Sequence, residues 1–239
     1  YVTCQYPADK YFSGKKNDKG YEILFHKNIN VSGNQKTQRL KFYRNKNEVR
    51  YLADLSFSDF AEGFSSVESI RMKKGNHIGF TIHFPYSKVK GIIAVNDDTM
   101  NVSGVGYLDH IYQSDLATDI YSRGIRYFSL SKDIEGGFVF VCNTKNVNTT
   151  TGISVRGSKN AVEGLIPKEL GKSQEFIRFA HDTLEFSAFE ERHKWGVLDE
   201  VPKGLGRVTG LFAKNMVLTR GIGKTKDKKK YMITKINIK

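Results

Sequence analysis

The chain has 239 residues, with 38 Lys or Arg against 25 Asp or Glu, so its formal net charge is +13 at pH 7. Hydrophobic residues make up 39% of the sequence, which is enough for a buried core and excludes a disordered chain. No apolar run reaches the roughly 18 residues of a membrane-spanning helix, and no hydrophobic signal segment stands at the beginning.

The composition and the apolar pattern predict an all-β protein. The 16 Phe and 12 Tyr residues are of types that fit a half-buried pleated surface. Residues 77–84 alternate with period two and place Ile78, Phe80, Ile82 and Phe84 on one face. Residues 89–95 and 99–104 follow as two more strands, joined by turn residues at 96–98. Together they predict an antiparallel β-meander.

Strands are also predicted before and after this meander, on the same criteria. They span residues 36–43, 49–57, 125–130, 137–143, 152–156, 207–212, 216–220 and 230–238. Residues 172–192 fit a helix or strands, and the alternation of 183–189 favours a strand. Segments rich in Gly, Asn and Lys predict loops at 12–20 and 143–151, and the lysine-rich run 224–230 predicts a hairpin turn. Because residues 107–121 divide two β-rich halves, we expect domains at 1–113 and 114–239.

Residues 102–110, Val-Ser-Gly-Val-Gly-Tyr-Leu-Asp-His, are the best candidate for a functional site. Gly104 and Gly106 predict a bend or bulge at the end of a strand. Tyr107 and Asp109 would share one face of a continuing strand, with His110 on the other. An Asp beside a His can fix the imidazole tautomer and raise its basicity, although both side chains would equally suit a structural corner.

Two arginines follow this segment after a short polar loop. Arg123 and Arg126 are candidate buried counterions for Asp109. We therefore expect a ligand site made of Tyr107, Asp109, His110, Arg123 and Arg126, with Asp109 and His110 as catalytic residues if the protein is an enzyme.

No motif for a cofactor, a metal ion or a nucleophilic serine is present. Residues 221–225, Gly-Ile-Gly-Lys-Thr, resemble the end of a phosphate-binding loop, but Leu218 stands where its first glycine is required. Cys4 and Cys142 allow one disulfide and form no zinc cluster. We expect neither a cofactor nor a bound metal.

The region 75–141 resembles the lipocalin-like family of carotenoid 1,2-hydratases (hydroxyneurosporene synthases) and AttH-type bacterial proteins. Fungal Diels–Alderases and the fungal survival-factor ceramide carriers are more distant members. The resemblance rests on Lys88-Val-Lys-Gly-Ile-Ile-Ala-Val, on the Gly-Val-Gly-Tyr-Leu-Asp-His string that ends at His110, and on the strands at 121–130 and 136–141.

The resemblance implies two packed antiparallel lipocalin-like barrels or sandwiches, with a hydrophobic ligand in a barrel or between the domains. The first domain is short, so we expect missing strands before Tyr1. Asp109 and His110 match the Asp-His of the family, but Leu108 replaces a His of the hydratases, and Ile111-Tyr112 replaces their Asn-Trp pair. These departures favour binding over hydratase chemistry.

The resulting hypothesis is binding or transport of a hydrophobic small molecule, such as a lipid or isoprenoid. The first alternative is an acid–base enzyme of hydratase, isomerase or cyclase type that uses Asp109 or His110. The second is a basic module that binds nucleic acid or another anion. The charge of +13 first indicates a solvated surface, then peripheral contact with anionic membrane, and least of all nucleic acid. Periplasmic or secreted and cytoplasmic, membrane-peripheral locations both remain open.

Overall fold

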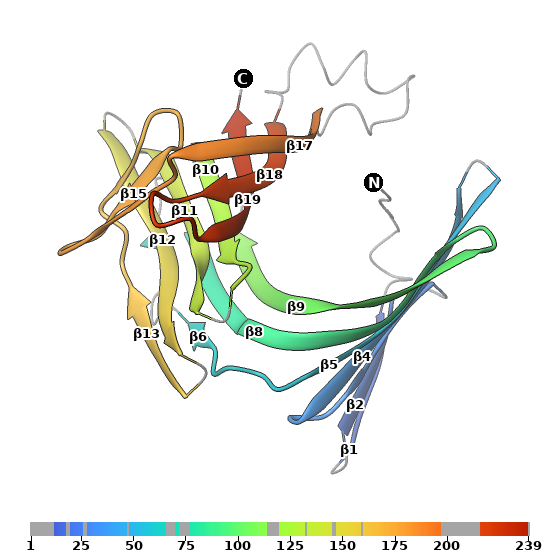
Figure 1. Ribbon diagram of the computed structural model, residues 1–239. Coiled ribbons are helices and arrows are strands. Elements are labelled where there is room, and N and C mark those ends of the chain that lie inside the picture. Colours follow the sequence, from blue (N-terminus) through green and yellow to red (C-terminus); the bar gives the residue numbers. More distant parts are fainter. Residues whose placement is uncertain are drawn as a thin grey trace. The chain divides into compact units, whose positions relative to one another are not determined.

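The computed structural model (Figure 1) describes most of the chain. It covers residues 12–17, 20–25, 28–46, 48–65, 70–71, 77–113, 120–131, 133–144, 147–158, 160–196 and 216–238. Every pair of strands with an assigned register is antiparallel. The predicted all-β, antiparallel fold is therefore confirmed, and its sheets are curled. A search of the described residues for a helix with the length and hydropathy of a membrane span finds none.

The chain forms two compact units. One contains Tyr1–Phe60 and Tyr86–Gly106, and the other contains Ala61–Pro85 and Tyr107–Lys239. Two long strands, β8 (His77–Val95) and β9 (Asp98–Gln113), contribute residues to both units. The division into domains at 1–113 and 114–239 stays a prediction, because it concerns segments that fold independently.

The first unit is a single antiparallel sheet. It contains β1 (Phe12–Asn17), β2 (Gly20–Phe25), β3 (Ile29–Gly33), β4 (Thr37–Lys46) and β5 (Val49–Ser58), with β5 paired to the second half of β8. Alternation gives the sheet two different faces. Leu40 lies opposite Leu55 on a half-buried apolar face. Arg39 and Asp54 form a 2.6 Å ion pair on the polar face.

The second unit contains a seven-stranded sheet in the order β13-β12-β11-β10-β19-β18-β17. Its strands are β10 (Tyr121–Ser129), β11 (Ile134–Thr144), β12 (Val147–Ser158), β13 (Ala161–Leu165), β17 (Ala188–Gly196), β18 (Met216–Lys224) and β19 (Lys230–Ile238). A small sheet contains β14 (Glu169–Leu170), β15 (Phe176–Arg178) and β16 (Thr183–Glu185). Two short strands, β6 (Phe64–Ser65) and β7 (Ile70–Arg71), pair with the first half of β8.

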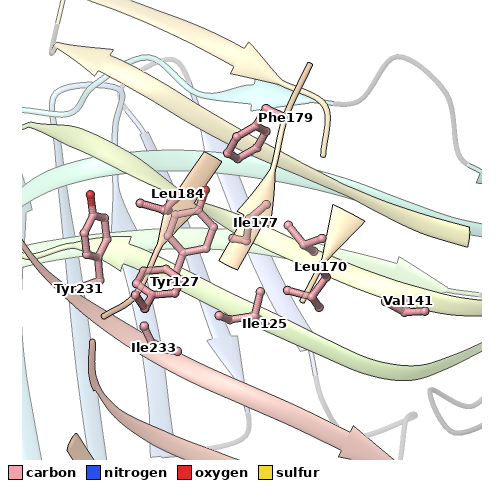
Figure 2. Close-up of a cluster of buried hydrophobic side chains, with 11 residues drawn as sticks. Ile125, Tyr127, Val141, Leu170, Ile177, Phe179, Leu184, Tyr231 and Ile233 are labelled. Atoms are coloured by element: carbon pink, nitrogen blue, oxygen red, sulfur yellow. The ribbon is translucent and has the colours of Figure 1, made fainter. Parts of the chain in front are cut away.

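One face of the seven-stranded sheet carries a hydrophobic cluster, and we name it the core face. Figure 2 shows Ile177 and Leu184 of the small sheet beside Tyr127 of β10. The cluster comprises Ile125, Tyr127, Val139, Val141, Leu170, Ile177, Phe179, Leu184, Phe186, Tyr231 and Ile233. The protein's own side chains therefore fill this side of the sheet.

The opposite face of the seven-stranded sheet, which we name the far face, is also partly covered. Phe80 from the first half of β8 packs on Phe138, with ring centroids 5.0 Å apart, and on Phe140 at 5.9 Å. Ile78 and Ile82 are fully buried with it. The alternating pattern of 77–84 thus places Ile78, Phe80 and Ile82 in a core, while Phe84 is half-buried.

Several predicted elements differ in extent. Residues 77–84 and 89–95 form one continuous strand, β8. The predicted loop at 12–20 is wrong because β1 pairs with β2 there, and the loop at 143–151 is wrong because β11 and β12 pair out to Thr144 and Val147. Within 172–192 the structure has strands β15, β16 and the start of β17. The strand predicted at 207–212 lies outside the described residues.

Candidate functional site

The Gly-x-Gly-Tyr-x-Asp-His segment lies within β9, which continues through it to Gln113. The sequence predicted that the strand ends at Gly104 and Gly106, and this prediction is wrong. A Cβ atom at Gly104 would meet nothing within 4 Å, whereas one at Gly106 would lie 2.5 Å from Ser87 Oγ and 2.8 Å from Val89 Cγ2. Gly106 thus allows two strands to pack closely.

Asp109 is held by Arg126 of β10. Arg126 Nη2 donates a hydrogen bond to Asp109 Oδ1 at 2.5 Å. The Asp109 side chain is only 6% exposed, while that of Arg126 is 39% exposed. The Asp109 carboxylate therefore lies in the interior, whereas the Arg126 side chain that binds it is partly exposed to solvent.

Tyr107 lies on the same side of β9 and adds an aromatic wall. Its ring stacks on Phe128 of β10, with centroids 5.0 Å apart and planes 4° from parallel. The Arg126 guanidinium lies 5.7 Å from the centre of the Tyr107 ring. Tyr107 Oη and Asp109 Oδ2 are both buried, and the two side chains interact with each other.

Burial alters the acidity of both groups. It raises the pKa of the Asp109 carboxyl, although Arg126 opposes the shift. Burial, reinforced by the charge of Asp109, holds the pKa of the Tyr107 phenol well above its usual range. Asp109 therefore keeps its proton to a higher pH than an exposed aspartate, which is the property of a general acid.

The other two predicted site residues lie elsewhere. His110 is exposed, and its ring is 6.2 Å from that of His83 and 6.0 Å from that of Tyr112. Arg123 donates from Nη2 to the carbonyl oxygen of Leu170 at 3.2 Å, on the core side of β10. The structure thus brings together Tyr107, Asp109 and Arg126, and separates His110 and Arg123 from them.

A pocket of about 250 Å³ opens beside Tyr107 on the far face, and we name it the far-face pocket. It is lined by Tyr107, Arg126, Phe128, Arg220, Met232 and Thr234. Antiparallel pairing explains this set, because directly opposed residues share a face. Phe128 is opposite Met232, and Thr234 is opposite both Arg126 and Arg220.

Four pocket residues were missed by sequence reasoning. Phe128 follows Arg126 by two residues in β10, whereas Arg220, Met232 and Thr234 come from β18 and β19, which are distant in sequence from β9. Alternation in residues 216–220 and 230–238 indicates which of them share a face. The register that sets Thr234 opposite Arg126 is a tertiary property, so no local signal could have found it.

A larger hollow of about 530 Å³ lies at one end of the seven-stranded sheet and is lined mainly by charged side chains. Arg156 donates to Glu135 at 2.7 Å and also pairs with Asp182, and Tyr231 Oη donates to Glu135 at 2.6 Å. These groups satisfy one another. Among the described residues, no three His, Cys, Asp or Glu side chains are grouped to hold a metal ion.

Comparison with known proteins gives one structural likeness. No protein-family model matches the chain, and no curated protein matches it either. The chain is similar to the crystal structure of kievitone hydratase from Nectria haematococca, with 10% sequence identity and a TM-score of 0.47, over 95% of this chain and 86% of that one. A likeness of this extent does not establish a shared activity.

Proposed function

We propose that the protein binds a small, largely apolar molecule in the far-face pocket. The observation that carries this proposal is the combination of an apolar wall with polar side chains beside it. Phe128, Met232 and the Tyr107 ring supply the wall, and Arg126, Arg220 and Thr234 supply the polar groups. Ligand sites typically combine these two features.

The size of the pocket limits its ligand. Sites for drug-sized molecules usually enclose roughly 300–1,000 Å³, and this pocket has about 250 Å³. A compact aromatic or isoprenoid unit fits that space, either as a whole ligand or as the end of a longer one. Covering apolar surface there contributes roughly 25 cal/mol per Å².

Filling the pocket tests the proposal. We expect the neutral probe 2-naphthamide to bind the wild-type protein in a fluorescence titration and to lose binding to Met232→Trp. The control is Met100→Trp, since Met100 is 58% exposed and lies outside the pocket. Equal binding to both variants would overturn the proposal.

A second candidate is an acid–base enzyme acting on an apolar substrate, with Asp109 as general acid. The raised pKa and burial of Asp109 favour it. His110 does not share this role, because its side chain is on the opposite face of β9. Hydration or isomerisation of an alkene would begin with a proton from Asp109 to carbon, with water or a base completing the step.

The two candidates differ in what Asp109→Asn does. Compounds extracted from the purified protein are returned to it in D₂O, and their mass is measured. An enzyme adds solvent deuterium, and Asp109→Asn loses this exchange while naphthamide still binds. A binding protein adds no deuterium.

A nucleic-acid module would instead bind an RNA oligonucleotide. Its affinity would fall steeply with salt and would not change in Met232→Trp.

A further inference from the structure

We propose that the ligand of the far-face pocket carries an anionic head group, a carboxylate or a chemically similar oxyanion, and that Arg220 binds it. The inference rests on the proposed function and names the class of its ligand. The charged side chains that line the pocket support this proposal.

The pocket is lined by two guanidinium groups, those of Arg126 and Arg220, and by no acidic side chain. Arg126 pairs with Asp109, which lies outside the lining, at 2.5 Å. Within the described part of the chain, no Asp or Glu forms an ion pair with Arg220. Arg220 is exposed and has no ion-pair partner among the residues that the structure describes, and a positive charge beside an apolar wall attracts an amphipathic anion.

Two neighbours contact the exposed side chain of Arg220. Its guanidinium lies over the Trp195 ring, 5.5 Å from the ring centre, and its Nε donates to Thr234 Oγ1 at 3.4 Å. These contacts leave the terminal N–H groups for the two oxygens of a carboxylate.

The register shows how an amphipathic ligand would lie. Arg220, Thr234 and Arg126 form one row across β18, β19 and β10, and Phe128 and Met232 form the neighbouring pair two residues along. Adjacent strands are about 4.8 Å apart, so the row from Arg220 to Arg126 is roughly 10 Å long. A ligand with its head at Arg220 and a bicyclic body over Met232 and Phe128 matches these spacings.

The test compares 2-naphthoate with its neutral isostere 2-naphthamide by isothermal titration calorimetry. We expect wild-type protein to bind naphthoate roughly tenfold or more tightly, because a charge-assisted hydrogen bond is gained. In Arg220→Gln we expect this preference, taken as the ratio of the two affinities, to fall below about twofold. The matched control is Arg178→Gln, because the Arg178 guanidinium also lies over an aromatic ring, 5.6 Å from the centre of Phe176, but outside the pocket.

The outcomes separate the two proposals. If wild-type protein binds both probes equally, or if Arg220→Gln keeps the preference for naphthoate, the anionic head group is wrong and the apolar site stands. If neither probe binds, the proposed function itself fails. Urea unfolding checks that Arg220→Gln is folded. If it is not, Arg220→Lys replaces it, and we expect a reduced preference because the charge remains and the two-pronged geometry is lost.

Discussion

Asp109 and Arg126 form an ion pair whose two members differ sharply in burial. The carboxylate is nearly inaccessible, whereas the guanidinium reaches solvent. Burial outweighs the attraction of Arg126, so the pKa of Asp109 is raised rather than lowered. The ionised Asp109 therefore lowers the stability of the fold at neutral pH. A buried residue with such a shifted pKa is a candidate for a functional role.

Asp109→Asn is expected to stabilise the protein at high pH. A carboxyl whose pKa is raised by folding contributes stability that is complete below its unfolded pKa and is lost as the pH rises through its folded pKa. Asparagine does not titrate. The urea midpoint of the variant should therefore exceed that of the wild type at about pH 8. The two midpoints should converge at about pH 4. A variant that is less stable at high pH would contradict the raised pKa.

Arg126→Gln is expected to destabilise the protein, because it leaves a buried carboxylate without its partner. We expect a loss of roughly 1–3 kcal/mol at neutral pH, below the roughly 3–5 kcal/mol of a fully buried pair, since Asp109 can take up a proton. Adding Asp109→Asn should restore most of the loss in chemical denaturation. The control Arg39→Gln breaks an exposed pair with Asp54 and should cost about 0–1 kcal/mol.

The two glycines of the motif should respond differently to the same substitution. Gly106→Ala introduces a methyl group against Ser87 Oγ and Val89 Cγ2, and we expect it to cost about 1–3 kcal/mol. Gly104→Ala enters open space and should change stability by less than about 0.5 kcal/mol. Thermal unfolding of both variants checks this. Equal losses would show that both positions need a glycine for another reason.

The thiol of Cys142 should be inert in the folded protein. It is buried and free, and burial raises its pKa to about 12. Because the thiolate is the reactive form, iodoacetamide at about pH 8 should leave Cys142 unmodified in the native protein. The same reagent should label Cys142 when the protein is unfolded in urea. Peptide mass spectrometry measures the labelling at this residue. Rapid labelling without denaturant would show that the strand end opens.

The sequence predicts the fold class and the central strands because the alternation of residues such as Ile78 and Phe80 is a local property. It fails for β1, whose Ser-Gly-Lys-Lys segment has no apolar alternation and becomes a strand by pairing with β2. Tyr107, Asp109 and Arg126 could be predicted as members of a site because polar and charged side chains lie close together in this part of the sequence. Arg220 is not, since only the pairing of β18, β19 and β10 brings it to the pocket.

The alternation of β10 and β19 also separates two kinds of selection. Ile125, Tyr127, Tyr231 and Ile233 point into the hydrophobic cluster, while Arg126, Phe128, Met232 and Thr234 line the pocket on the other side. If the pocket binds a ligand as proposed, substitutions at Phe128, Met232 or Thr234 would change what is bound, while substitutions at the residues between them would change the packing of the core. A descendant of this chain would then acquire a different ligand without repacking its core.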